Sequence, residues 1–319
     1  MDLCRLPDDE LPSLQELFER VFKHPISSEL LQWKYANRRG ESWVAADVSG
    51  NIVMHCGLNF RDVLIGGERV RAAQLTDLMA PPKAQGLTRQ ESPFGKLMHR
   101  ILCTLPRPDN PSGIAFGFPS DRAMRLGEHM GVYREVDRLM DLEFTPLDVL
   151  DAGIAWREIT HFTESDNALV NRVWKAMAAD FCEFSIGVRD SAYLKHRYLE
   201  HPEKQYSLLI VEKKGLWRNT PIGLAVVGPG HERRELLDII CPSKSMKTLI
   251  QATQCWLTEK KGELLKLSLT ERFARQLESF ACRCTYTEFR IMGNPLSPAI
   301  STTRLERRFW LTGGDTDYR

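Results

Sequence analysis

Leu75-Thr76-Asp77-Leu78-Met79-Ala80-Pro81 decides the fold, because a second version of this stretch occurs as Leu236-Leu237-Asp238-Ile239-Ile240-Cys241-Pro242. Each version has the pattern of an apolar strand with one internal Asp that ends at a Pro. Upstream, Leu31-Gln32-Trp33-Lys34-Tyr35 likewise returns as Leu194-Lys195-His196-Arg197-Tyr198. The displacements are 161 positions (75 to 236) and 163 positions (31 to 194), about half of the 319 residues. This nearly constant spacing predicts a unit that occurs twice.

Length and composition agree with two domains, each long enough to bury its own core. We expect a first domain at 1–145, a linker at 146–156 and a second domain at 157–319. The 43 basic and 42 acidic residues nearly cancel, so no overall field would draw the chain to nucleic acid or to an anionic membrane. A nucleic-acid partner is therefore not predicted.

Other sequence features bear on compartment and metal content. No apolar run approaches the roughly 20 residues of a membrane span, and the first residues lack the order of a signal peptide. We therefore expect a cytoplasmic protein without a membrane span. The eight cysteines are scattered without the spacing of metal ligands, so no metal site is predicted.

Both halves predict the same order of elements from hydrophobic periodicity and turn residues. In the first half, Ser13 with Glu16 has the pattern of a capping box, and Gly66-Gly67 that of a hairpin turn. There we expect helices at 14–22, 30–35, 94–105 and 120–130, and strands at 43–47, 52–58, 63–65, 69–79, 113–118 and 133–144. In the second half we expect helices at 166–181, 191–198, 244–261 and 271–280, strands at 206–211, 222–227, 235–240, 264–269 and 285–292, and a last strand at 309–311.

The segment Ser120-Asp121-Arg122-Ala123-Met124-Arg125-Leu126-Gly127-Glu128-His129-Met130-Gly131-Val132 keeps register with the motif N-x-x-A-x-x-L-Y-x-x-L-G-F. Ala123, Leu126 and Gly131 match it, and Ser120 stands where the motif has Asn. With this motif and the element order, the chain resembles the GNAT superfamily of acyl-CoA-dependent acetyltransferases. Gly127 departs from the motif, because many members place there a tyrosine that protonates the CoA thiolate.

The resemblance implies an α/β fold of two tandem GNAT-like domains, each a mixed, mostly antiparallel sheet flanked by helices. It also implies acetyl-CoA or another acyl-CoA as cofactor, bound by the first domain. The acceptor would be an amine or hydroxyl of a small molecule or saccharide. In the second domain, the stretch from Pro242 to Lys247 contains no glycine, so we expect its cofactor loop to be degenerate.

The loop after Pro81 is the expected pyrophosphate site, because backbone N–H groups at a helix N-terminus bind phosphates and glycine lets the anion approach. The family loop R/Q-x-x-G-x-G/A fits in two registers. One begins at Gln90 and has Pro93 in place of the central glycine; the other begins at Gln85, with Thr88 in place of the second glycine. The residues expected to bind the cofactor are Met79, Ala80, Gln85, Gly86, Arg89, Gln90, Gly95, Lys96 and Ser120.

Acyl transfer needs a base for the acceptor, hydrogen-bond donors for the oxyanion and an acid for the leaving thiolate. The backbone near Met79 and Ala80 is the expected donor. Tyr133 is the candidate acid, with packing at the start of a strand as the alternative. Asp77 is the candidate base, but its recurrence as Asp238 equally suggests a structural role, such as a buried ion pair with Arg38 or Lys34.

Two further sets of residues have alternative interpretations. Trp33 and Tyr35 are candidates for stacking on an acceptor, with core packing as the alternative. The two acidic residues of 312–319 either reach over a cleft or belong to a solvated end, although Trp310 suggests that this tail is anchored.

Three functions remain open from sequence. The first is an acyl-CoA-dependent N- or O-acyltransferase, which the sequence favours. The second is a non-catalytic binding protein with this fold, suggested by Gly127 and Pro93. The third is a FemX-like aminoacyl transferase, for which the expected basic insertion is not visible in the sequence.

Overall fold

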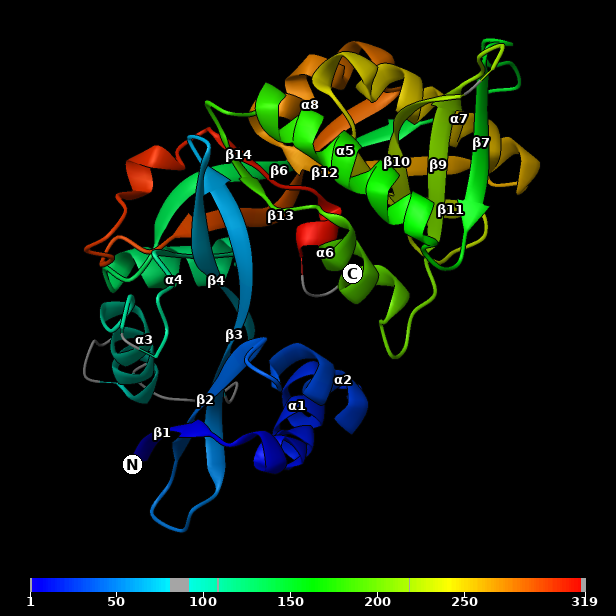
Figure 1. The fold of residues 1–319 in the computed structure, drawn as a ribbon. Helices are drawn as coiled ribbons and strands as arrows, with labels where there is room; N and C mark the ends of the chain where they lie inside the picture. The colour runs from blue at the N-terminus through cyan, green and yellow to red at the C-terminus, as the bar shows by residue number, and fades with distance from the viewer. Residues whose placement is uncertain (1, 81–91, 108, 218, 317–319) are drawn as a thin grey trace. The chain divides into compact units, whose positions relative to one another are not determined.

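The computed structural model describes residues 2–80, 92–107, 109–217 and 219–316 (Figure 1). The chain divides into two compact units, which are described separately. Unit 1 contains Met1–Val63, Arg69–Asp137 and Glu288–Glu306, and unit 2 contains Leu64–Glu68, Arg138–Thr287 and Arg307–Arg319. The bounds of these units differ from those of the domains 1–145 and 157–319, which were predicted from the repeated motifs. The two repeated domains stay a prediction.

Unit 1 is a sheet flanked by helices. In it, β1, β2, β3, β4, β5 and β13 are neighbours in that order, with β4 and β5 parallel and the pairs β1–β2, β2–β3 and β5–β13 antiparallel. Its elements are β1 (Asp2–Leu6), η1 (Asp8–Ser13), α1 (Leu14–Phe22), α2 (Ser28–Tyr35), β2 (Gly40–Ala46), β3 (Ile52–Ile65), β4 (Glu68–Met79), α3 (Pro93–Cys103), β5 (Ile114–Gly117), α4 (Asp121–His129), the start of β6 (Arg134–Phe144), the end of β13 (Arg283–Gly293) and η5 (Thr302–Arg304).

Unit 2 has a sheet in which β6, β12, β11, β10, β9 and β7 are neighbours in that order. Here β11 and β12 are parallel and the other four pairs are antiparallel. Its further elements are β7 (Ile154–Ile159), α5 (Glu164–Asp180), β8 (Ser185–Gly187), α6 (Ser191–Leu194), the π-helical turn η2 (Lys195–Leu199), β9 (Ser207–Lys213), β10 (Thr220–Val227), β11 (Arg233–Ile240), η3 (Ser243–Ser245), α7 (Met246–Glu259), β12 (Leu264–Thr270), α8 (Glu271–Leu277), η4 (Glu278–Phe280), β14 (Phe309–Trp310) and η6 (Gly313–Asp315).

In unit 1, helices cover both faces of the sheet. Trp43 and Ala45 of β2 belong to the apolar cluster that contains α3, whereas Val44 belongs to the cluster that contains α1 and α2. Because successive residues of a strand point to opposite faces, α3 lies on one face and α1 with α2 on the other. Apolar burial on both faces stabilises this unit by roughly 25 cal/mol for each Å² removed from water.

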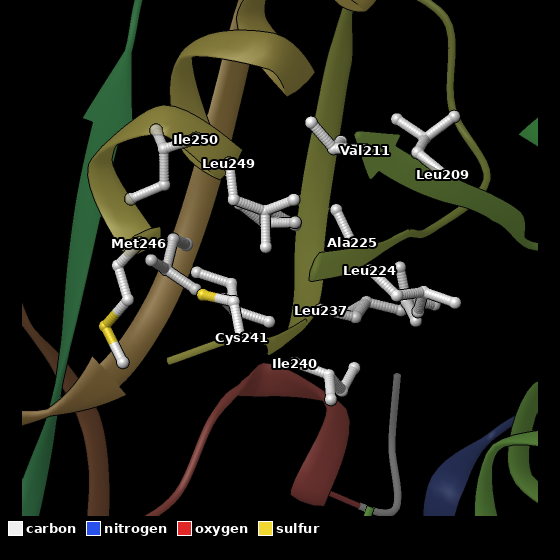
Figure 2. Close-up of a cluster of buried hydrophobic side chains, with 14 of the residues drawn as sticks. Leu209, Val211, Leu224, Ala225, Leu237, Ile240, Cys241, Met246, Leu249 and Ile250 are labelled. Atoms are coloured by element: carbon white, nitrogen blue, oxygen red, sulfur yellow. The ribbon is translucent and has the colours of Figure 1, made fainter. Parts of the chain in front are cut away.

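One continuous cluster forms the core of unit 2. Figure 2 shows part of it, where Met246, Leu249 and Ile250 of α7 face side chains of β10 and β11. Gly223 lets β10 lie close to the end of β11, because a Cβ there would lie 2.6 Å from Cys241 Cβ and 2.7 Å from the Ile240 carbonyl oxygen. It also leaves room for Leu249 of α7, whose Cδ2 would lie 3.2 Å from that Cβ.

The structure confirms the class predicted from sequence, with mixed and mostly antiparallel sheets flanked by helices. Several details were wrong. Helix α1 forms as expected, but Ser13 makes no side-chain cap, and the strands expected at 52–58 and 63–65 are one strand, β3. The short strands β1, β7 and β8 were not predicted. The tail is not a solvated end at 312–316, where all five residues are buried.

In the part of the chain that the structure describes, none of the helices combines the length and apolar content that a membrane-spanning helix requires.

Candidate active site

Strands β4 and β5 of unit 1 stop pairing at a defined point. They pair in parallel from Ala72 opposite Ile114 to Leu75 opposite Gly117, and no further. Strand β4 nevertheless continues to Met79. Asp77 lies on this continuation with φ of 43°, a backbone conformation outside the β region that distorts the strand. We call the unpaired edges of β4 and β5 beyond Leu75 and Gly117 the first notch.

The edge of β5 that faces away from β4 is paired with β13. Gly117 pairs with Met292 of β13, Arg290 donates its N–H to the Pro119 carbonyl at 3.0 Å, and Ser120 forms a bridge with Phe289. The unpaired edge of this segment therefore faces β4. Among the described residues, no backbone segment pairs with that edge, so an extended ligand can use it.

Helix α3 begins at the far end of the loop that follows β4. Ser92 caps it by accepting a hydrogen bond from the Gly95 N–H at 3.0 Å, Pro93 is its first residue, and its first turn contains no acidic residue. Lys96 is exposed on the next turn. Because a helix N-terminus carries partial positive charge, this end of α3 favours an anion. Gly95 is used by the cap, so among residues 92–96 the N–H of Phe94 is the one left for a ligand.

Part of the expected cofactor site falls outside the described residues. Gln85, Gly86, Arg89 and Gln90 lie in the segment 81–91, of which the structure describes nothing. The expected donors at the end of β4 are described: Met79 is buried and Ala80 is half-buried. On the other side of the notch, Ser120 caps α4 by accepting from the Ala123 N–H at 3.4 Å.

Tyr133 occupies the space that Gly127 leaves beside α4. A Cβ on Gly127 would lie 2.0 Å from Cδ2 of Tyr133, so the ring packs directly on the glycine. Tyr133 belongs to the apolar cluster with α3 and is 6% exposed. Burial, and to a lesser extent the Cys56 thiol, raises the pKa of Tyr133 far above its ordinary value. At neutral pH the side chain is therefore a neutral phenol that can donate a proton.

Asp77 is one member of a buried polar cluster. Its carboxylate lies 2.5 Å from Nζ of Lys34 and accepts a hydrogen bond from the hydroxyl of Tyr35. The ion pair with Lys34 is the structural alternative that the sequence suggested, and the structure contains it. Burial acts to raise the pKa of Asp77, but the Lys34 charge and the hydrogen bonds from Lys34 and Tyr35 outweigh it, so the pKa is lowered. A carboxylate held in this way is a weakened base.

His55 completes this cluster. From sequence it is only a weak candidate base, with a satisfied core histidine as the alternative. It is fully buried, with Nδ1 2.8 Å from the Asp77 carbonyl oxygen and Nε2 2.9 Å from the Ser42 hydroxyl. Burial lowers the pKa of His55 to about 4, although the charge of Asp77 acts in the opposite direction. The ring is therefore neutral at pH 7 and ties β2, β3 and the distorted part of β4 together.

Unit 2 contains the same arrangement of Tyr and Asp. The Tyr198 hydroxyl donates to Asp238 Oδ2 at 3.2 Å, as Tyr35 does to Asp77. The cation is different, because Arg189 and not the Lys34 counterpart Arg197 contacts Asp238, with Nε 2.8 Å from Oδ1. Arg189 lies outside the repeated motifs, so no local sequence signal could identify it.

The two candidate acceptor-stacking residues have different environments. Tyr35 is 1% exposed and packs in the cluster formed with α1 and α2, which is the core-packing alternative left open by the sequence. Trp33 is half-buried. Their roles toward an acceptor stay a prediction.

Comparison with known proteins finds one domain model and several solved structures that are similar to this chain. Residues 3–131 match the model of the acetyltransferase (GNAT) domain. No curated protein matches the sequence. An Enterococcus faecalis protein described as a probable N-acyltransferase has a similar structure, with a TM-score of 0.67 and 10% identity over 92% of this chain and 71% of that one.

Two further solved structures are similar. A GCN5-related N-acetyltransferase from Kribbella flavida gives a TM-score of 0.64 with 14% identity over 93% of this chain and 72% of that one. Saccharomyces cerevisiae N-myristoyltransferase, solved with bound myristoyl-CoA, gives 0.56 with 9% identity over 99% and 86%. At these identities the likeness establishes the fold alone.

The chain thus has the GNAT fold, and residues 3–131, which contain the first notch, match the model of the acetyltransferase (GNAT) domain. This match supports an acyltransferase at the level of class.

Proposed function

We propose that the protein is an acyl-CoA-dependent N- or O-acyltransferase that binds acetyl-CoA or another acyl-CoA at the first notch. One observation carries the proposal: β4 and β5 part after Leu75 and Gly117. Residues of β4, β5 and α3 share one apolar cluster with Tyr133. The acceptor is an amine or hydroxyl of a small molecule or saccharide. The sequence domains 1–145 and 157–319 descend from a duplication, as the repeated motifs suggest.

The chemistry of the residues around the first notch fits an acyl-CoA. Such a molecule supplies the acyl group as an activated thioester, and its pantetheine arm carries amides that suit an unpaired strand edge. Phosphates would lie near the Phe94 N–H and Lys96, where no acidic residue of the first turn opposes them. From the sequence, Gln85, Gly86, Arg89 and Gln90 would complete this binding, and Ser120 and Gly95 would shape its two helix ends.

Tyr133 would act as the acid for the leaving thiol. Its ring fills the position that Gly127 leaves empty, where many family members carry their tyrosine. The phenol is protonated at neutral pH, although burial raises its pKa and makes it a weaker acid than an exposed tyrosine. On transfer, the acceptor nitrogen or oxygen bonds to the acyl carbon, the carbon–sulfur bond breaks and the sulfur takes the Tyr133 proton. The proton that the acceptor gives up passes through water and restores the phenol. Backbone N–H groups near Met79 and Ala80 would stabilise the oxyanion.

Asp77 would contribute mainly by position. With its pKa lowered by Lys34, it is a poor acceptor of the ammonium proton, and its contacts to Lys34 and Tyr35 favour a role in fixing the end of β4. Trp33 and Tyr35 would then border the acceptor side through packing.

A second candidate is a non-catalytic binding protein with this fold. It is favoured by Pro93, which removes one N–H donor from the first turn of α3, and by the packing of Tyr133 in an apolar cluster. A FemX-like aminoacyl transferase is a further alternative from sequence.

Titration calorimetry with acetyl-CoA, longer acyl-CoAs and free CoA tests the proposal. We expect binding and a rise in thermal midpoint, because a ligand that binds the native state stabilises it. Release of free thiol on adding an amine or sugar acceptor separates the enzyme from the binding protein. If none of the three ligands binds or raises the midpoint at millimolar concentration, the acyltransferase proposal fails.

A further inference from the structure

Unit 2 has a second notch, which begins at the counterpart of the position where the first one begins. Strands β11 and β12 pair in parallel from Arg233 opposite Leu264 to Leu236 opposite Leu267, and no further. Leu236 is the repeat counterpart of Leu75. The other edge of β12 pairs with β6 as far as Thr270 opposite Leu139, so the edge left unpaired at Leu269 and Thr270 faces β11.

The C-terminal segment of the chain lies on this edge. Thr312 forms an antiparallel bridge with Leu269, and the Thr270 N–H donates to the Leu311 carbonyl oxygen at 3.1 Å. The Leu311 N–H donates in return to the Thr270 hydroxyl at 3.4 Å. These backbone contacts add a short strand segment to β12.

The same segment also contacts β11, where only glycine fits. A Cβ on Gly314 would lie 2.8 Å from the Leu237 carbonyl oxygen and 2.2 Å from the Tyr198 hydroxyl. In Figure 2 the red C-terminal ribbon lies below Leu237 and Ile240. The segment therefore fills the second notch from β12 across to β11.

Charged contacts fix the sequence of the segment. Arg189 donates from Nη2 to Asp315 Oδ2 at 2.6 Å while its Nε contacts Asp238, and all three side chains are fully buried. Arg197 donates to the carbonyl oxygens of Gly314 at 3.2 Å and Thr316 at 2.7 Å. Asp315 also accepts the Thr312 N–H at 2.7 Å. An acidic residue after two glycines is thus matched to Arg189.

We propose that the second notch is a peptide-binding site, whose ligand is an extended segment of the type Thr-Gly-Gly-Asp and whose resident occupant is the chain's own residues 309–316. Recognition combines strand addition with a buried arginine–carboxylate contact. Because the tail fills the second notch, this notch should take no acyl-CoA, and that consequence rests on the proposed function. Peptide binding by the notch does not depend on the proposed function.

The full chain can test this with a protease recognition sequence inserted between Glu306 and Arg307, which are both exposed. After cleavage, we expect the segment 307–319 to stay bound and to co-elute with the rest of the chain on gel filtration. A labelled synthetic peptide of residues 307–319 should then exchange into the nicked protein. No acyl-CoA is present, so failure of the proposed function would not affect the result.

Competing peptides establish which contacts matter. With Asp315→Asn the affinity should fall about 10- to 100-fold, the range for loss of a charged hydrogen bond, and Gly314→Ala should weaken it by at least about tenfold through the clash. The matched control is the Arg308→Ala peptide, because the Arg308 side chain is exposed. This peptide should compete as strongly as the parent peptide. Loss of the tail on cleavage, or equal competition by the Asp315→Asn peptide, would overturn the proposal.

Discussion

The two notches begin at equivalent residues but end differently. In unit 1, β5 leads through Pro119 to Ser120, and in unit 2, β12 leads through Leu269 to Thr270; both hydroxyl residues precede a helix. Leu269 and Thr270 pair with the tail. Pro119 has no N–H to offer, and no described backbone segment takes the corresponding edge in unit 1.

This difference shows how one architecture can be assigned to two purposes. The parting of two parallel strands creates unpaired backbone groups that need a partner. In unit 2 the chain provides that partner and buries Arg189 with two carboxylates around it. In unit 1 no described backbone segment takes the edge, and we propose that a ligand does. A notch of this kind is therefore open or closed according to what the rest of the chain places beside it.

The largest expected effect comes from removing the cation of the second notch. Arg189→Met leaves Asp238 and Asp315 buried without their shared partner, which should cost about 3–5 kcal/mol of unfolding free energy. Lys34→Met in unit 1 should cost less, because it leaves only one carboxylate without its cation. That carboxylate belongs to Asp77, whose side chain is 10% exposed. Urea unfolding of both variants measures the difference.

Lys195→Met is the matched control, because the Lys195 side chain is 60% exposed and its contact with Glu200 is at 3.6 Å. It should change the free energy of unfolding by less than about 0.5 kcal/mol. A greater loss from Lys34→Met than from Arg189→Met would contradict the view that the second notch is the closed, more deeply buried one.

Sequence patterns predicted most helices and strands because each depends on local periodicity. Helix α3 follows from Ser92 and Pro93, and the hairpin of β3 and β4 from Gly66-Gly67. The repeat also singled out Asp77 with Asp238 and Tyr35 with Tyr198, but it did not predict the hydrogen bond that joins each Tyr to its Asp. In contrast, β8 and β14 pair residues that are more than 100 positions apart, and such pairing leaves no local signal.

The candidate site was harder to predict than the fold. Asp77 was noticed because it recurs, but its partner His55 has no motif and is recognised only by its contacts in space. Arg189 could not be predicted for the same reason. The repeat counterpart of Lys34 is Arg197, which binds the backbone of the tail. Long-range polar contacts depend on tertiary structure, so a single sequence does not specify them.

Acidic pH should destabilise unit 1 through His55. The folded pKa of about 4 lies below the ordinary value of 6.5, so between these values the unfolded chain binds the proton and the folded chain does not. The free energy of unfolding should therefore fall as pH drops from 6.5 to 4, by up to about 1.4 kcal/mol per pH unit and about 3 kcal/mol in all.

Urea unfolding at several pH values measures this slope, and His55→Gln should flatten it. His129→Gln is the control, because His129 is exposed and its replacement should leave the slope unchanged. An unchanged slope in the His55 variant would show that His55 is not the group responsible.

Tyr133→Phe should lower kcat about 100-fold, a typical contribution of a general acid, while the Kd for acyl-CoA changes little. The substitution removes only the hydroxyl and keeps the ring on Gly127, so loss of packing is not the cause. Tyr286→Phe is a control, because Tyr286 is an exposed tyrosine of unit 2. Unchanged turnover in Tyr133→Phe would assign the ring to packing alone.

The smallest expected effect concerns the anion-favouring end of α3. Lys96→Ala should weaken acyl-CoA binding about three- to fivefold, since one charge near a helix N-terminus contributes modestly. Arg100→Ala removes an exposed charge in the last turn of the same helix and should have no such effect. Calorimetry of the parent should give one acyl-CoA per chain, because the second notch is filled. Two equivalent acyl-CoA sites per chain would contradict a second notch that is filled by the tail. An equal loss of acyl-CoA affinity in Lys96→Ala and Arg100→Ala would contradict a role for the N-terminal end of α3.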